Sequence, residues 1–135
     1  MFPFRVSFEP GTPIYEQVVY AAKKAIVAGE MIPGERFPSV RILSQSLKIN
    51  PNTAHKVVSQ LVEDGLLEVH LGLGTVVARR QSFTEAERAH LLEDEVEHLV
   101  VEAKRLGLTL RDLTALIGSH WHQLSPAQTT KGRTS

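Results

Sequence analysis

The sequence contains no cysteine, which excludes a disulfide framework and a thiolate metal site. Its acidic and basic residues balance to a formal net charge of zero, so the composition alone does not indicate a nucleic-acid partner. No apolar run is long enough to cross a bilayer. The N-terminal stretch lacks the charged start and apolar core of a signal peptide. These absences favour a cytoplasmic protein with no membrane partner, and no cofactor is expected.

The charges are distributed unevenly along the chain. Residues 1–80 carry nine Lys or Arg against seven Asp or Glu, whereas residues 81–135 carry six against eight. The difference is mild and permits DNA binding without indicating it. Such binding would require basic groups gathered on one face.

The stretch from Asn50 to Gly65 predicts one helix with both ends marked. Asn50 is a good N-cap residue, Pro51 suits the first helical position, and Gly65 suits the left-handed residue that stops a helix. One face is apolar at helical spacing: Ala54, Val57, Val58 and Leu61. The other face starts with groups that can meet base edges and phosphates: Asn52, Thr53, His55 and Lys56. An ordinary amphipathic helix with a solvated face is the alternative.

Two shorter patterns precede this helix. Thr12 is positioned to cap a first helix that stops at Gly29. Ser39 is positioned to cap a short second helix that ends at Ile49, immediately before Asn50. Two short helices joined by a tight connection are the helix-turn-helix pattern.

After Gly65 the apolar period changes from that of a helix to that of a strand. Leu67, Val69 and Leu71 alternate with polar residues, a glycine-containing loop follows, and residues 75–78 form a second apolar run. This pattern predicts a β-hairpin. The expected fold is therefore mainly α with a small hairpin: residues 1–80 form a winged helix-turn-helix DNA-binding domain.

Residues 81–124 predict a two-helix dimerisation segment. Ser82 or Thr84 caps a long helix from about Glu85 to Leu106, which stops at Gly107, and Thr109 with Asp112 forms the capping box of a last helix. A wide apolar seam follows heptad spacing in the first of these helices and continues in the second: Leu92, Val96, Leu99, Ala103, Leu106, Leu113 and Ile117. The seam could pack on the winged helix, but pairing with a second copy is favoured. Residues 125–135 predict a disordered tail.

Five segments in order and register resemble the GntR family of bacterial transcription regulators, and specifically its YtrA-like branch. They lie at residues 13–18, 32–39, 50–54, 61–66 and 72–75. The resemblance covers about residues 12–78. The Asn-Pro-Asn-Thr start of the third helix and the short C-terminal part are the features that indicate the YtrA-like branch.

The resemblance implies which residues contact double-stranded DNA. They are Arg41 in the second helix and the start of the third: Asn50, Asn52, Thr53, His55 and Lys56. The wing departs from the family pattern, because His70, Leu71 and Leu73 stand where basic residues are usual. His70 and Gly72 stay candidates for DNA contact, and Arg79 and Arg80 are candidates to compensate for the missing wing arginines.

The expected function is a transcription regulator, a repressor that acts as a homodimer on a palindromic operator. The resemblance makes a transporter operon the expected target and leaves an unidentified small-molecule effector open. A winged helix that binds protein instead of DNA is the alternative. No enzyme is expected, since no phosphate loop or nucleophile with a nearby base is present. His120 and His122 are too poorly spaced on a helix to predict a metal site.

Overall fold

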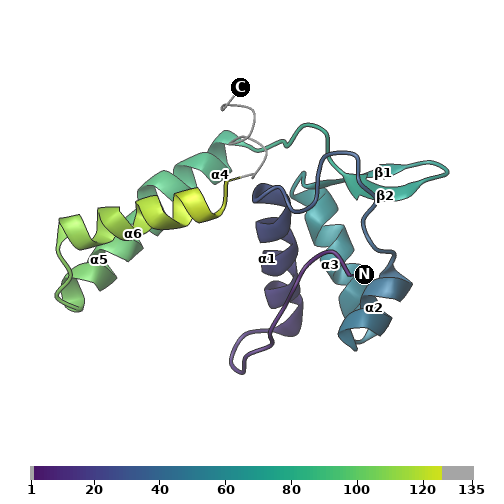
Figure 1. The fold of residues 1–135 in the computed structure, drawn as a ribbon, viewed down its shortest axis with the longest axis horizontal. Coiled ribbons are helices and arrows are strands. Elements are labelled where there is room, and N and C mark those ends of the chain that lie inside the picture. The colour runs from purple at the N-terminus through teal and green to yellow at the C-terminus, as the bar shows by residue number, and fades with distance from the viewer. Residues whose placement is uncertain (1, 126–135) are drawn as a thin grey trace. The chain divides into compact units, whose positions relative to one another are not determined.

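The computed structural model describes residues 2–125, which fall into two compact units, one ending at Ser82 and one spanning Phe83–Ser125. Of the predicted tail, residues 126–135 therefore lie outside the described part of the chain. The first unit contains three helices and a hairpin (Figure 1): α1 Ile14–Val27, α2 Val40–Leu47, α3 Pro51–Glu63, β1 Leu67–His70 and β2 Gly74–Val77. The predicted winged helix-turn-helix is confirmed.

The helix-turn-helix begins and ends where local sequence signals place it. The Ser39 hydroxyl accepts a hydrogen bond from the Ile42 amide at 3.2 Å, which caps α2. The Asn50 side-chain oxygen accepts from the Asn52 amide at 2.7 Å, which caps α3. In both cases a polar side chain satisfies an amide that the first helical turn leaves free. These caps fix the entry of the helix expected to read DNA.

The start of α1 differs from the prediction. Thr12 is not its cap: Pro13 occupies that position, and no side chain caps the helix. The Thr12 carbonyl instead accepts a hydrogen bond from Gln17 Nε2 at 2.8 Å. Gln17 also exchanges two hydrogen bonds with the backbone of Glu9, each 2.9 Å long. The capping prediction was wrong because the helix begins at Ile14, which puts Pro13, a residue with no side-chain acceptor, at the cap position.

The hairpin is tied to the helices by the segment before α2. β1 and β2 are antiparallel, with Leu67 opposite Val77 and His70 opposite Gly74. The Phe37 amide donates to the Thr75 carbonyl at 2.8 Å, and Arg36 bridges to Val76. The hairpin extends away from the helices (Figure 1), so the alternating apolar residues of β1 do not share one buried face.

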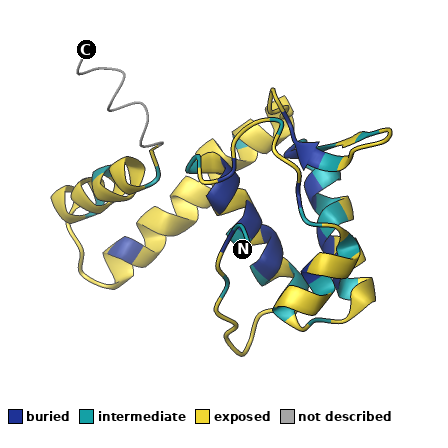
Figure 2. Cartoon of the chain, turned by 45° about the vertical axis from the view of Figure 1, so that its right-hand side comes forward, coloured by how far each residue is buried: buried dark blue, intermediate teal, exposed yellow. Residues whose placement is uncertain are grey.

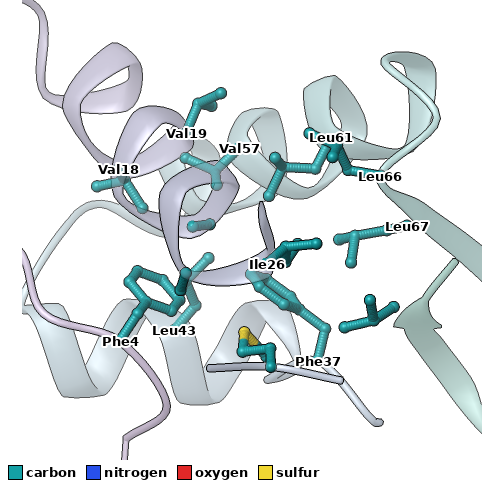
Figure 3. Packing of buried hydrophobic residues seen from close by; sticks show 14 of the residues in the cluster. Phe4, Val18, Val19, Ile26, Phe37, Leu43, Val57, Leu61, Leu66 and Leu67 are labelled. Carbon is teal, nitrogen blue, oxygen red and sulfur yellow. The ribbon is translucent and has the colours of Figure 1, made fainter. Parts of the chain in front are cut away.

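The core of the first unit lies between the three helices and the base of the hairpin (Figure 3). Fully buried side chains come from each of these elements: Val18, Leu43, Val57, Leu61 and Leu67. Phe4 inserts from the N-terminal arm, and its ring stacks on that of Phe37 with centroids 5.9 Å apart. Dense apolar packing of this kind fixes the position of α3 in the unit, while the polar face of the helix stays at the surface.

The second unit is a helical hairpin whose first arm is not a regular α-helix. It consists of α4 Glu85–Ala89, η1 His90–Glu95 and α5 Val96–Arg105, followed by α6 Leu110–Gln123. Thr84, not Ser82, caps the first arm in a capping box with Glu87. The predicted long helix is present across these three consecutive segments, but at η1 it is a π-helix with wider turns, which the sequence did not indicate. No helix in residues 2–125 is both long and apolar enough to span a bilayer.

Candidate nucleic-acid interface

The predicted DNA-reading residues of α2 and α3 lie at the surface of the first unit. Arg41, Asn52, His55 and Lys56 are exposed, and Thr53 is half-buried. Among the described residues, none donates to, accepts from or pairs with the side chains of Arg41, Asn52 or His55. Their donors and acceptors are therefore available to base edges and phosphates. These three side chains can therefore take up new polar contacts without breaking a hydrogen bond or an ion pair within the described residues.

Asn50 has a second task besides any DNA contact. Its side-chain oxygen is occupied by the capping bond to the Asn52 amide. Only the amide nitrogen of this side chain stays available as a donor. The geometry thus gives Asn50 a role in starting the helix, and its amide nitrogen can donate to a phosphate or a base acceptor.

Lys56 is held by an aromatic ring that the sequence analysis did not single out. Its ammonium nitrogen lies 4.0 Å from the ring centroid of Tyr15 on α1. A cation over the face of a ring at this distance is attracted by the ring quadrupole. Tyr15 and Lys56 lie far apart in the chain, so no local pattern could have indicated the pair. The contact keeps one positive charge near the first turns of α3.

The wing carries no free cation at its tip. The His70 ring nitrogen Nε2 lies 2.9 Å from Glu68 Oε1, so one polar atom of the ring is already paired. Gly72 is exposed in the turn, with a φ of +84° and open space around it. Its neighbours Leu71 and Leu73 are also exposed. The other nitrogen of His70 and the backbone of Gly72 stay accessible for contact with DNA.

Arg79 lies against the turn before α2. A Cβ added at Gly34 would come within 2.8 Å of Arg79 Nη2, so the guanidinium passes directly over this glycine. The Gly34 amide also donates to the Val77 carbonyl at 2.8 Å. The φ of Gly34 is +88°, which favours glycine at this turn whatever the position of the Arg79 side chain.

The predicted dimerisation residues of the second unit are mostly exposed in the single chain. Figure 2 shows yellow along nearly the whole helical hairpin, and Ala103 is its one buried residue within Phe83–Ser125. Leu113 is half-buried, and the other predicted seam residues are exposed: Leu92, Val96, Leu99, Leu106 and Ile117. Further large apolar side chains, among them Leu91, Leu116 and Trp121, are exposed as well. This unit has almost no core of its own.

Comparison with known proteins gives a consistent result. The model of the family described as bacterial regulatory proteins, gntR family, matches residues 14–77. The HTH-type transcriptional repressor YtrA of Bacillus subtilis is 33% identical over 103 residues, which cover 76% of this chain and 79% of that protein. The match to YtrA thus continues beyond the winged helix into the second unit.

Solved structures share the fold. A transcriptional antiterminator from Listeria monocytogenes EGD-e covers 90% of this chain and 91% of its own, with a TM-score of 0.79. At 23% identity this likeness shows the fold alone. AraR(DBD) in complex with operator ORX1 is 30% identical, with a TM-score of 0.50, and covers 58% of this chain and 100% of its own.

Proposed function

The chain belongs to the GntR family of bacterial regulatory proteins, and from this premise we propose that it is a repressor that binds a palindromic operator as a homodimer. Its family and relatives are transcriptional regulators with a DNA-binding helix-turn-helix, not enzymes. The observation that carries the proposal is the start of α3, where exposed polar side chains have no partner among the described residues.

Each predicted contact has a chemical role in this proposal. Arg41 binds a phosphate or reaches a guanine with its forked guanidinium, and Asn52 and Thr53 meet base edges or phosphates. Lys56 neutralises a phosphate, and its position over the Tyr15 ring keeps the ammonium near the helix start. Asn50, His55, His70 and Gly72 add hydrogen bonds at the edges of this surface. A good bidentate base contact discriminates by about 1–3 kcal/mol.

The homodimer is supported by the exposed apolar residues of the second unit. A helical hairpin with one buried residue among Phe83–Ser125 cannot be stable as a solvated structure, because its apolar side chains stay in water. A second copy of the chain has the same exposed apolar residues. Pairing along the predicted seam would therefore bury the apolar side chains of both copies. Two winged helices related by a twofold axis then read two half-sites of a palindrome.

The proposal also covers the target of the regulator and its signal. YtrA is named a repressor, and AraR(DBD) was solved with an operator, which supports repression through operator binding here. We place the operator upstream of the protein's own gene, with a transporter operon as the regulated unit. A small-molecule effector would bind between helices of the dimer. A winged helix that binds only protein is the competing function.

A gel shift with duplex DNA from upstream of the protein's own gene tests the proposal. The wild-type chain should give a discrete band that survives excess non-specific competitor and weakens with salt. The Arg41→Ala, Asn52→Ala double variant should lose the band, whereas the control Arg111→Ala, an exposed arginine of the second unit, should keep it. No shift at low salt would contradict the proposal and favour the protein-binding alternative.

A further inference from the structure

The N-terminal arm, residues 2–12, runs beside α1 (Figure 1), and both line an open hollow of about 1060 Å³. The arm is held at one end by Gln17, whose side chain forms hydrogen bonds with the backbone of Glu9 and Thr12. At the other end Phe4 is buried in the core. Because both ends of the arm are fixed, the hollow is part of the packed first unit.

The backbone of the arm has free hydrogen-bonding groups along this hollow. Residues 5–8 belong to no helix, strand or turn, and no hydrogen bond within residues 2–125 reaches their backbone amides or carbonyls. The side chains alternate in burial with the period of a strand: Phe4 and Val6 are buried or half-buried, whereas Arg5 and Ser7 are exposed. An unpaired segment of this kind is a template for a second strand.

Charged side chains of opposite sign line the two ends of the hollow. Glu9 and Glu16 line it at the start of α1. Lys24 and, from the arm, Arg5 line it toward the end of the helix, and Glu30 offsets one of these two positive charges. None of these five side chains forms an ion pair within residues 2–125. The hollow is therefore acidic at one end and carries one excess positive charge at the other.

We propose that this hollow binds a short peptide with free termini, extended along residues 5–8. The peptide backbone pairs with the free backbone groups of the arm as an added strand. Its terminal carboxylate binds Lys24 and Arg5, and its terminal ammonium group binds Glu9 and Glu16. The site lies within the first unit and needs no DNA, so the inference goes beyond the proposed function and does not rest on it.

The spacing of the charges sets the length of the peptide. Glu16 and Lys24 are eight residues apart on α1, which is about 12 Å along the helix axis. An extended chain of four residues spans about 13 Å and one of two residues about 7 Å, so a tetrapeptide reaches both ends and a dipeptide does not. Ala21 and Ala25 line the hollow from α1, and their small side chains leave room for a peptide backbone.

Tetra-alanine with free termini is the probe, titrated into the full chain and followed by amide NMR. The amides of residues 5–8 should shift, and the titration gives the Kd. Acetylation of the amino end and amidation of the carboxyl end should each weaken binding roughly twofold to fivefold, as expected for the loss of one exposed ion pair. Dialanine should bind more weakly than tetra-alanine, and so should tetra-alanine methylated at its backbone nitrogens, which cannot donate to the arm.

Two lysine variants test the carboxylate end of the site. Lys24→Gln should weaken the binding of tetra-alanine roughly twofold to fivefold, and amidation of the peptide should then have little further effect. Lys23→Gln is the matched control, because Lys23 is exposed on the same helix and does not line the hollow, so this variant should bind like wild type. Absence of shifts in residues 5–8, or equal binding of the free and the doubly blocked peptides, would overturn the site. Neither readout uses DNA, so such a result would leave the proposed function standing.

Discussion

At the scale of single residues, Gly65 is required both for its backbone and for its lack of a side chain. Its φ is +80°, and a Cβ there would meet the Ser82 hydroxyl and come within 2.9 Å of the Ser82 carbonyl oxygen. Gly11→Ala is a matched control, because Gly11 has a φ of +98° and open space around it. In both variants the free energy of unfolding should fall by about 1–2 kcal/mol, because alanine is strained in the left-handed conformation. Gly65→Ala should lower the free energy of unfolding by roughly 1–3 kcal/mol more, because its Cβ would overpack against Ser82.

Urea unfolding of the two variants measures this difference. Equal destabilisation would show that the Ser82 segment moves aside without cost, which would contradict the close packing seen here.

Gly65 also shows which residue roles a sequence can reveal. Its place as a helix stop follows from the pattern immediately before it, as do the caps at Ser39 and Asn50. The approach of Ser82 depends on the path of the chain after the hairpin, so no local pattern indicates it. The same holds for Tyr15 beneath the ammonium of Lys56. Contacts between residues far apart in the sequence form only when the core has packed, so local sequence patterns do not indicate them.

At the scale of elements, the capping box of α6 responds to pH. The Thr109 backbone amide donates to the Asp112 carboxylate at 2.9 Å. This bond, followed by the interaction with the Thr109 side chain, holds the pKa of Asp112 below its ordinary value of 3.8. A lowered pKa means that the charged form stabilises the folded helix start at pH values above the unfolded value, and that this contribution is lost as pH falls through the folded pKa. Carboxyl-carbon NMR should therefore give Asp112 a titration midpoint below 3.8.

The Asp112→Asn variant is the control for this titration. Its amide oxygen can still accept from the Thr109 amide but has no proton to bind in this range. The α6 start should then keep the same structure from pH 6 to about pH 3, as followed by the amide shifts of the first helical turn. A midpoint for Asp112 at or above its ordinary value would contradict the capping geometry.

The first arm of the second unit shows where element prediction fails. Its start was predictable from the capping box at Thr84, and its end from Gly107. The π-helix His90–Glu95 was not, because this segment contains neither proline nor glycine and keeps its apolar spacing. A π turn changes the angular positions of the residues before it, so Leu92 does not continue the Val96–Leu106 seam in ideal heptad register.

At the scale of the whole molecule, the second unit should decide the oligomeric state. Leu99→Glu places a charge in the predicted seam, where a second copy would bury it, so the dimer should dissociate. Val101→Glu is the matched control, because Val101 is exposed on the same helix and lies two residues away, on another side of it. Sedimentation velocity should give a monomer for the first variant and a dimer for the second. A dimer in both would place the interface elsewhere.

The salt dependence of DNA binding reports how many phosphate contacts the proposed dimer makes. The net charge is zero, so long-range attraction to DNA is weak. The proposed interface assigns two phosphate contacts to each copy, one from Arg41 and one from Lys56. Four such contacts in a dimer give a slope of log affinity against log salt of about −3.6. Lys56→Gln removes one contact per copy, so the slope should flatten by about 1.8 if two copies bind and by about 0.9 if one does. Arg111→Gln should leave the slope unchanged. A slope insensitive to Lys56 would mean that its ammonium stays over Tyr15 in the complex and serves the fold instead of the DNA.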